Sequence, residues 1–410
     1  MAANDALIID AVRSPRGIGK RDKGALSPIH PQKILGQVLN GLQERVGFDP
    51  ADVEDVVCGN GAHAGDHAHD IGRMAVLDAG WPISVPGVTL NRFCGSGQQA
   101  VTFGAMGIAA GHQDLVVGCG VESMSRPARN DTDGFHANNE RLLAAHPQVP
   151  QGLSADLIAT LDGSSREDCD ALGLESQRRA AAAIAEGRFD RSLIPIHHDD
   201  GTLALAEEEF PRPETTAEGL AALRPSFAKM VDFSMEQTDH TMAELMAQKY
   251  PDVTLEHVHH AGNSSGVVDG AGAVLLASGR YAEANGLTPR ARVVMTAVAA
   301  DEPLIMLTAP GPAALKCLDK AGMTVDDIDL FEVNEAFASV VLRFFGDTGA
   351  DPAKVNVNGG AIALGHPIGA TGAMLIGTLI DELERRDLQT GLVAMCTGGG
   401  MGTATIIERV

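Results

Sequence analysis

Short apolar runs, each followed by a polar or glycine-rich tip, recur along the chain. ADVEDVVCGN (51–60) resembles DDIDLFEVNE (326–335), because each has a polar helix end, an apolar strand and a tip that contains Asn. Two further pairs match in the same order: VTLNRFCGSGQQA (88–100) with VNVNGGAIALGHPIGATGA (355–373), and DLVVGCGVES (114–123) with GLVAMCTGGG (391–400). The offset is about 275 residues throughout, so the pattern predicts two related α/β halves in which strands lead into small-residue helices.

The repeat also predicts where chemistry would gather. If the two halves pair about a pseudo-twofold axis, the ends of equivalent strands meet. We therefore expect the tips at 91–97, 334–337, 364–372 and 396–400 to approach one site.

Residues 124–262 have a different pattern, in which irregular stretches alternate with amphipathic helices. A helix is predicted in SSREDCDALGLESQRRAAAAIAEGRF, capped by Ser164 or Ser165, and another in MEQTDHTMAELMAQKYP, ended by Pro251. Long insertions of this kind usually cover active sites. We expect an N-terminal half at 1–123 and 263–285, an inserted loop domain at 124–262, and a C-terminal half at 286–410.

The composition fits this architecture and narrows the functional classes. The 410 residues include 47 glycines and only 4% aromatics, which suits close packing of helices on sheets. The 31 basic and 54 acidic residues give a net charge of −23, so the chain lacks the global basic character of a nucleic-acid-binding protein.

The compartment is predicted from the cysteines and from the start of the chain. The six cysteines form no CxxC pair, so we expect free thiols in a reducing environment: Cys58, Cys94, Cys119, Cys169, Cys317 and Cys396. The first residues enter a strand pattern rather than a signal peptide, and no apolar stretch is long enough to span a membrane. We expect a cytoplasmic protein that binds neither membranes nor nucleic acid.

Four candidate chemical groups lie at the predicted tips. Cys94 sits beside a Gly-Ser-Gly turn, Asn334 follows an apolar strand, His366 is held between glycine and proline, and Cys396 enters a glycine-rich loop. Each has an ordinary structural explanation on its own. Together they supply a nucleophile, a base, a second thiol and backbone donors for an oxyanion. Gly95 and Gly97 would let the backbone turn sharply, and a helix N-terminus there would lower the pKa of the Cys94 thiol.

Five ordered motifs resemble those of the thiolase family of acyl-CoA acyltransferases: NRFCGSGQQA, AGNSSGVVDGAGAVLLAS, VNEAFA, ALGHPIGATGA and CTGGGMGTA. The resemblance covers essentially the whole chain. It implies an α/β thiolase fold, in which two pseudo-twofold-related halves form a five-layered α-β-α-β-α sandwich with an inserted loop domain. It also implies the exchange of acyl groups between 3-ketoacyl-CoA, CoA, acetyl-CoA and acyl-CoA.

The resemblance assigns a role to each candidate catalytic group. His366 would deprotonate Cys94, which would carry the acyl group as a covalent thioester. Cys396 would protonate the departing acetyl-CoA enolate. The enolate oxygen would be held by His366 and a water bound to Asn334, and the thioester oxyanion by the N–H groups of Cys94 and Gly398.

The resemblance also places coenzyme A contacts, with CoA as a substrate rather than a permanently bound cofactor. Arg212 resembles the arginine at the nucleotide end, and Ser265 the serine near the pantetheine. The apolar contacts along that arm would be Leu223, Phe227, Ala336 and Phe337. The resemblance implies no metal ion. It does imply a homodimer or a homotetramer.

The chain departs from the family near the expected acyl pocket. Family members specific for acetoacetyl groups carry His-Met-Gly where this chain has Pro150, Gln151 and Gly152. The family segment Met-Gly-x-Gly-Pro is MLTAPGPA (306–313) here, which keeps Met306, an expected substrate contact, but changes the next residues. An extra stretch at about 228–260 lies beside the expected CoA arm. We hypothesise acceptance of longer or broader acyl groups, which activity on a four-carbon substrate alone would refute.

Three rival interpretations remain at this stage. The loop 62–70 holds a group typical of metal ligands (His63, Asp66, His67, His69 and Asp70), although a polar loop after a strand explains it better. A ketoacyl synthase shares the implied fold but resembles a Cys-His-His arrangement, which Cys396 does not fit. A non-catalytic lipid carrier or acyl-CoA-binding protein would be expected to have lost one of the four tip residues, and all four are present.

Overall fold

The computed structural model describes residues 2–126, 137–235 and 237–410. A single ten-stranded mixed sheet runs through the molecule in the order β10-β11-β12-β9-β1-β8-β5-β3-β4, with β2 paired to β8. Its strands are β1 (Ala6–Arg13), β2 (Gly17–Ile18), β3 (Asp55–Gly59), β4 (Gly87–Leu90), β5 (Leu115–Ser123), β8 (Val268–Ser278), β9 (Ala291–Ala300), β10 (Leu330–Val333), β11 (Thr390–Thr397) and β12 (Met401–Arg409).

The strand pairings repeat between the two parts of the sheet, which confirms the two related halves. β3 and β5 are parallel, as are β10 and β11. β5-β8-β1 and β11-β12-β9 are both antiparallel. The parallel partner of β3, which is β4, has its counterpart in a single parallel bridge between Phe331 and Val355. The halves join where Leu7 and Ile8 of β1 pair with Arg292 and Ala291 of β9.

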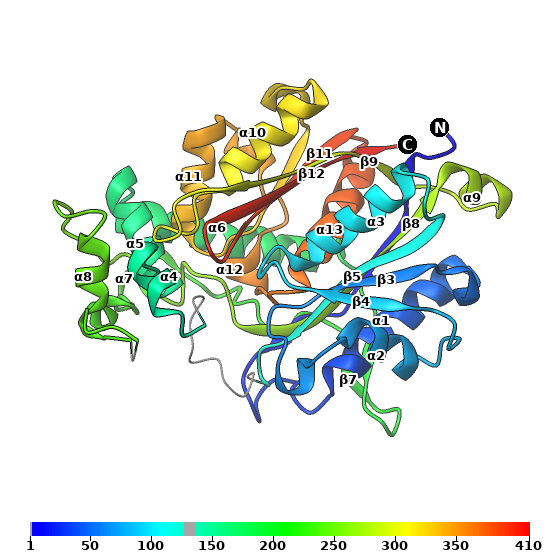
Figure 1. The fold of residues 1–410 in the computed structure, drawn as a ribbon, viewed down its shortest axis with the longest axis horizontal. Coiled ribbons are helices and arrows are strands. Elements are labelled where there is room, and N and C mark those ends of the chain that lie inside the picture. The colour runs from blue at the N-terminus through cyan, green and yellow to red at the C-terminus, as the bar shows by residue number, and fades with distance from the viewer. Residues whose placement is uncertain (1, 127–136, 236) are drawn as a thin grey trace.

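The alternation of side chains along the strands builds the five layers. In β1, Leu7 and Ile9 pack towards α1 (Pro31–Val46) and α2 (Ile71–Asp78), whereas Ile8 packs towards α3 (Ser96–Ala109) and α13 (Thr371–Arg386). In β10, Leu330 packs towards α13, whereas Phe331 packs towards α10 (Pro310–Ala321) and α11 (Ala338–Thr348). Helices α3 and α13 therefore form the central layer between the two parts of the sheet (Figure 1).

The segment between β5 and β8 holds most of the remaining elements and lies largely beside the C-terminal part of the sheet (Figure 1). They are α4 (Glu140–Ala145), α5 (Gln151–Asp162), α6 (Arg166–Ala185), β6 (Ile196–His197), β7 (Leu203–Leu205), α7 (Ala217–Ala221), η3 (Ala228–Asp232) and α8 (Met242–Ala247). The short elements elsewhere are η1 (Pro50–Asp52), η2 (Gly65–His67), α9 (Gly279–Ala284), η4 (Val325–Asp327), η5 (Pro352–Lys354) and α12 (Ala361–Leu364).

Two helix predictions in this segment have different outcomes. Ser165, rather than Ser164, caps α6 through a reciprocal capping box with Asp168. The second helix is shorter than predicted, because Thr241 caps it and it ends at Ala247, before Pro251. None of the helices that the structure describes combines the length and hydropathy needed to cross a membrane.

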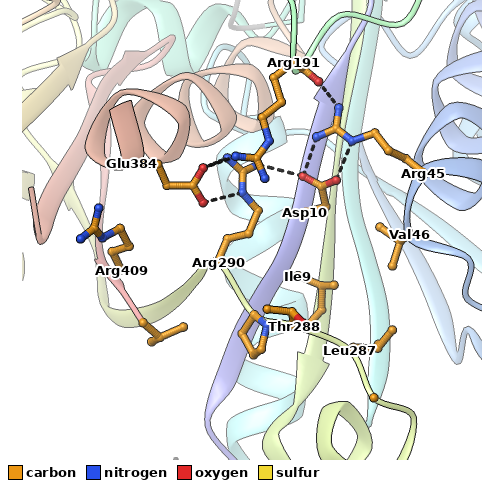
Figure 2. A pocket seen from close by; sticks show the side chains of 13 residues that line it. Ile9, Asp10, Arg45, Val46, Arg191, Leu287, Thr288, Arg290, Glu384 and Arg409 are labelled. Carbon is orange, nitrogen blue, oxygen red and sulfur yellow. Dashed lines mark hydrogen bonds and ion pairs between the residues drawn. The ribbon is translucent and has the colours of Figure 1, made fainter. Parts of the chain in front are cut away.

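Buried charges tie three parts of the chain together at the junction of β1 and β9 (Figure 2). Asp10 of β1 accepts hydrogen bonds from Arg45 at the end of α1 and from Arg290, which precedes β9. Arg290 also pairs with Glu384 of α13, and Glu384 pairs with Arg191 of the inserted segment. Asp10 and Arg290 are the most buried of these groups, and each has more than one partner of opposite charge.

Candidate active site

Cys94 lies in a tight turn between β4 and α3. Ser96 fastens this turn, because its Oγ accepts a hydrogen bond from Arg92 N–H at 2.8 Å and donates one to the Phe93 carbonyl at 2.6 Å. The residue in the left-handed region is Phe93, with φ of 49°, whereas Gly95 has φ of −81°. The expectation that Gly95 bends the chain is therefore wrong, and Phe93 takes the strained conformation instead.

The glycines beside Cys94 allow the C-terminal half to approach closely. A Cβ atom on Gly95 would lie 2.7 Å from Thr397 Cγ2, and one on Gly97 would lie 2.6 Å from the Gly369 carbonyl oxygen. Because real Cβ atoms do not approach other atoms so closely, a side chain at either position would push the two halves apart. These contacts bring the tips that carry Cys94, His366 and Cys396 towards each other.

The Cys94 thiol is buried, with 5% of the residue exposed. Burial raises its pKa to about 11, and the N–H groups of Cys94 itself and of Gly398 partly oppose that rise. The prediction that the helix N-terminus lowers this pKa is wrong in its net direction, because desolvation outweighs the donors. The resting thiol is protonated at neutral pH and needs a base before it can attack a carbonyl.

Cys396 lies near Cys94 at the end of β11 and is fully buried. Burial, and then the nearby Cys94, raise the pKa of the Cys396 thiol well above its usual range. Gly398 follows two residues later, and its N–H group acts on the Cys94 sulfur. The predicted convergence of the 91–97 and 396–400 tips is therefore present.

His366 is held in one orientation by its own turn. Its N–H group donates to the Gly266 carbonyl at 2.9 Å, and its ring Nδ1 lies 2.6 Å from Thr371 Oγ1. Because the Thr371 hydroxyl donates to the Pro367 carbonyl, it accepts from Nδ1–H, which leaves the lone pair on Nε2. Burial, and then Arg16, lower the pKa of His366 to about 3, so the ring is neutral and can accept a proton at Nε2.

Asn334 faces the unprotonated Nε2 of His366. Its Nδ2 lies 3.4 Å from His366 Nε2, and its backbone N–H donates to the Ala394 carbonyl at 3.0 Å. Asn334 Oδ1 is buried and has no hydrogen-bond partner among the residues that the structure describes. An orphaned acceptor of this kind suits an ordered water molecule.

An apolar cluster surrounds Cys396 on the side of the inserted segment. It contains Met306, Ala336 and Phe337 together with Leu153 of α5 and Met242 of α8. Phe227 packs on this cluster, with its ring 5.9 Å from that of Phe337 in an edge-to-face contact. Four of the residues predicted to contact substrate therefore share one wall beside a predicted catalytic thiol.

The remaining predicted contacts are not members of this apolar cluster. Arg212 and Leu223 line a cavity of 210 Å³ with Gln177, Thr216 and Gly262, and the Arg212 guanidinium stacks 5.5 Å from the Phe210 ring. Ser265 connects this region to the site, because its N–H group donates to the Ala336 carbonyl at 2.9 Å.

The loop 62–70 has separate structural partners for its polar side chains. Asp66 pairs with Arg126, His67 accepts a hydrogen bond from Ser123 N–H, and Asp70 caps α2. Among the described residues, no group of three or more His, Cys, Asp or Glu side chains could hold a metal ion.

Three residues near the site were not predicted as functional: Glu122, Gln151 and Thr371. Thr371 lies within a motif that carried the resemblance and Glu122 within the repeated stretch DLVVGCGVES, but their roles depend on contacts made only after folding. Gln151 was noted only as a departure from the family pattern, and its side chain lies close enough to Cys94 to lower the thiol pKa.

The chain matches known proteins over almost its whole length. The family model described as "Thiolase, N-terminal domain" matches residues 6–235, and "Thiolase, C-terminal domain" matches residues 287–409. The steroid 3-ketoacyl-CoA thiolase FadA6 of Mycobacterium tuberculosis is 41% identical over 417 residues, which cover 99% of this chain and 94% of that protein. The 3-ketoacyl-CoA thiolase of Cronobacter sakazakii is 38% identical over 411 residues, with coverage of 98% and 99%.

Solved structures show the same fold over the whole chain. The acetyl-CoA acetyltransferase of Bacillus anthracis has a TM-score of 0.84 and 34% identity, and each chain is covered completely. The human mitochondrial 3-ketoacyl-CoA thiolase, solved in complex with CoA, has a TM-score of 0.84 and 32% identity, with coverage of 100% of this chain and 99% of that one.

Proposed function

The chain belongs to the thiolase family of acyltransferases, and from this premise we propose that it exchanges acyl groups between CoA thioesters through Cys94. The observation that carries the proposal is the meeting of Cys94, Cys396 and the Gly398 N–H group at the tips of the two halves. A neutral histidine whose free Nε2 faces a buried asparagine completes the set.

The reaction begins with a proton transfer from the Cys94 thiol to His366 Nε2. No hydrogen bond joins these two residues within the described part of the chain, so we assign the transfer to the substrate-bound enzyme. The pKa of Cys94 is high and that of His366 is low, so this transfer would be unfavourable for either group alone. Mutual attraction in a site closed to water stabilises the resulting ion pair.

The thiolate then attacks the 3-keto carbon of the substrate. The bond between C2 and C3 breaks, its electron pair leaves with acetyl-CoA as an enolate, and Cys396 gives that enolate a proton. Cys94 keeps the shortened acyl group as a thioester. A second CoA then loses its thiol proton to the Cys396 thiolate and attacks the thioester. Acyl-CoA leaves, and the Cys94 thiolate recovers its proton from His366.

Developing negative charge would meet fixed donors at two places. The N–H groups of Cys94 and Gly398 would hold the thioester oxyanion, and His366 with a water on Asn334 would hold the enolate oxygen. One preorganised donor of this kind lowers a barrier by about 3 kcal/mol. The unpartnered Asn334 Oδ1 supports the placement of that water.

Coenzyme A is proposed as a substrate rather than a resident cofactor. A relative of the same fold was solved with CoA bound. We place the nucleotide end of CoA near Arg212 and Leu223, whose cavity offers a stacked guanidinium to anionic phosphates. The pantetheine arm would pass Ser265 and Phe227 towards Cys94.

The acyl group is proposed to be longer or bulkier than acetoacetyl. Helix α8, which belongs to the extra stretch at 228–260, packs in the same cluster as Met306 and Cys396. Met230, Met235, Met242 and Met246 contribute to that wall, and methionine side chains adapt to varied shapes. The relative whose name specifies a steroid 3-ketoacyl-CoA supports a bulky substrate.

A thiolysis assay tests both the mechanism and the acyl preference. Cleavage of acetoacetyl-CoA and of longer 3-ketoacyl-CoAs in the presence of CoA is measured for the wild type and for Cys94→Ala. We expect the variant to fold normally and to lose the covalent acyl adduct with at least about 10³-fold lower kcat. The same adduct in the variant would refute the role of Cys94, and activity confined to acetoacetyl-CoA would refute the larger pocket.

We further propose that the chain is divided as the sequence predicts, with 124–262 as an inserted loop domain. We also propose that it is cytoplasmic and forms a homodimer or homotetramer. Strand β4 lies at the end of the sheet order. Large apolar side chains are exposed on β4, in the loop before it and on α3: Ile83, Val88, Phe103 and Met106. An open strand edge flanked by apolar side chains suits a second copy of the same chain.

A further inference from the structure

Glu122 lies near the end of β5 and is 3% exposed, although the mechanism above gives it no role. Its Oε2 accepts hydrogen bonds from Gly61 N–H at 2.7 Å and from Gly369 N–H at 2.9 Å. Its Oε1 accepts one from Ala62 N–H at 3.1 Å. One carboxylate therefore joins a tip of the N-terminal half to the turn that carries His366.

The two segments joined by Glu122 are in direct contact. A Cβ atom on Gly369 would lie 2.6 Å from Asn60 Cα, and one on Gly61 would lie 2.8 Å from Ile368 Cγ2. Since the Gly369 backbone lies directly against the backbone of Asn60, the spacing of the two segments depends on the groups that bind both. Glu122 is the side chain that accepts from both segments through one oxygen atom.

Backbone N–H groups donate to the Glu122 carboxyl oxygens, and the neighbouring His67 ring does not. His67 Nε2 lies 3.9 Å from Glu122 Oε1, but that nitrogen accepts a hydrogen bond from Ser123 N–H and therefore carries no proton. Burial lowers the pKa of His67 to about 4, so the ring stays neutral. A carboxylate that accepts several N–H groups is a strong and directional clamp.

We propose that Glu122 is a positioning residue, which fixes the His366 turn against the N-terminal half through Gly369 and so holds His366 in place beside Asn334. The inference rests on the proposed roles of His366 and Cys94. In this proposal Glu122 acts through the Gly369 turn, not on the reacting atoms of His366 or Cys94. Its negative charge has a second effect, because it opposes formation of the Cys94 thiolate.

These two effects allow a test with two variants. Glu122→Gln removes the charge and replaces one acceptor oxygen with an amide donor that faces backbone N–H groups. Glu122→Asp keeps the charge but is one methylene shorter and cannot reach both segments equally. We expect kcat for thiolysis to fall about 10- to 100-fold in both variants, with KM changed less than about twofold.

The rate of Cys94 alkylation by iodoacetamide at pH 8 is then measured by mass spectrometry. This rate distinguishes a specific loss of the Glu122 charge from a general opening of the site. Loss of the charge in Glu122→Gln should raise this rate about three- to tenfold, whereas Glu122→Asp should leave it within about twofold. A retained kcat in Glu122→Gln would overturn the proposal. Equal acceleration of alkylation in both variants would also overturn it, because that result indicates a generally opened site.

A matched control is Glu382→Gln on α13. Glu382 is also buried but bonds Arg385, Arg386 and Asn358 rather than the tips. We expect its kcat to stay within about twofold of wild type, and an equal loss in both glutamine variants would overturn the proposal. If Cys94→Ala retained activity while Glu122→Gln lost it, the nucleophile assignment would fail but the need for the carboxylate would stand.

Discussion

At the scale of single residues, the site depends on neutral groups that burial keeps neutral. Cys94 has a raised pKa and His366 a lowered one, and desolvation is the largest cause in both cases. The unfolded His366 would bind a proton below about pH 6.5, whereas the folded one would not until about pH 3. His366 therefore makes the fold less stable as pH falls through this window, and His67 acts in the same direction down to about pH 4.

The hydroxyl of Thr371 sets which nitrogen of His366 is free, so its removal should be visible in catalysis. In Thr371→Val, Nδ1–H loses its acceptor and the ring can rotate or change tautomer. We expect kcat for thiolysis to fall about 10- to 100-fold, with the fold retained by circular dichroism. Thr378→Val is the control, because Thr378 is a buried threonine of the same helix that bonds only to the Met374 carbonyl in the described structure. Equal activities in the two variants would contradict the orienting role.

At the scale of elements, the sequence patterns predicted the strands better than the short helices. Apolar runs such as VEDVVCGN and IDLFEVNE form β3 and β10, because both faces of these strands are buried. Helix α8 is shorter than its amphipathic pattern suggested, since the capping box of Thr241 and Glu244 starts it late. Thr241 and Glu244, spaced three residues apart, are the sequence signal that marks the start of this helix.

Some residues of the site can be identified from a short local motif, whereas others depend on contacts between distant parts of the chain. Cys94, His366 and Cys396 stand in short motifs, so the sequence was sufficient to select them. Glu122 accepts from Gly369, which lies 247 residues away, and only the folded pairing of the halves makes that contact. The left-handed conformation of Phe93 was also not predictable, because a bulky aromatic residue rarely adopts a positive φ.

Helix α5 offers a test of the acyl wall at this scale. A Cβ atom on Gly152 would lie 2.3 Å from Phe227 Cδ1, so Gly152→Ala should displace the Phe227 ring. We expect the free energy of unfolding in urea to fall by about 1–3 kcal/mol, and kcat/KM to fall more for long acyl groups than for acetoacetyl-CoA. Gly346→Ala in α11 meets nothing within 4 Å and should stabilise the protein by about 0.5–1 kcal/mol. Identical acyl-chain profiles for wild type and Gly152→Ala would exclude Phe227 from the pocket.

At the scale of the whole molecule, the sheet itself joins the two halves through few residue pairs, and side chains supply many further contacts. Only two residue pairs connect β1 to β9 in the described sheet. The layer of α3 and α13 and the charge network of Asp10, Arg290 and Glu384 supply further contacts between the halves. The relative placement of the tips is therefore set by side-chain packing and buried charge as well as by the sheet.

The assembly proposed above makes a prediction at this scale. Val88 lies on β4 and is 45% exposed, so Val88→Lys would place a charge in the proposed interface. We expect light scattering to report a multiple of the chain mass for the wild type and a smaller species for the variant. Val298→Lys, at a 37% exposed position of β9, should leave the assembly intact. A wild-type protein that is monomeric at micromolar concentration would contradict the proposal.

The repeated strand order has a consequence for how the two copies depend on each other. The tip that carries Cys94 in one half corresponds to the tip that carries His366 in the other, and the tip that carries Glu122 corresponds to the one after Cys396. If both halves descend from one ancestral unit, equivalent positions have become unlike partners. A fragment with only one half would lack either Cys94 or both His366 and Cys396. The reaction therefore requires both halves.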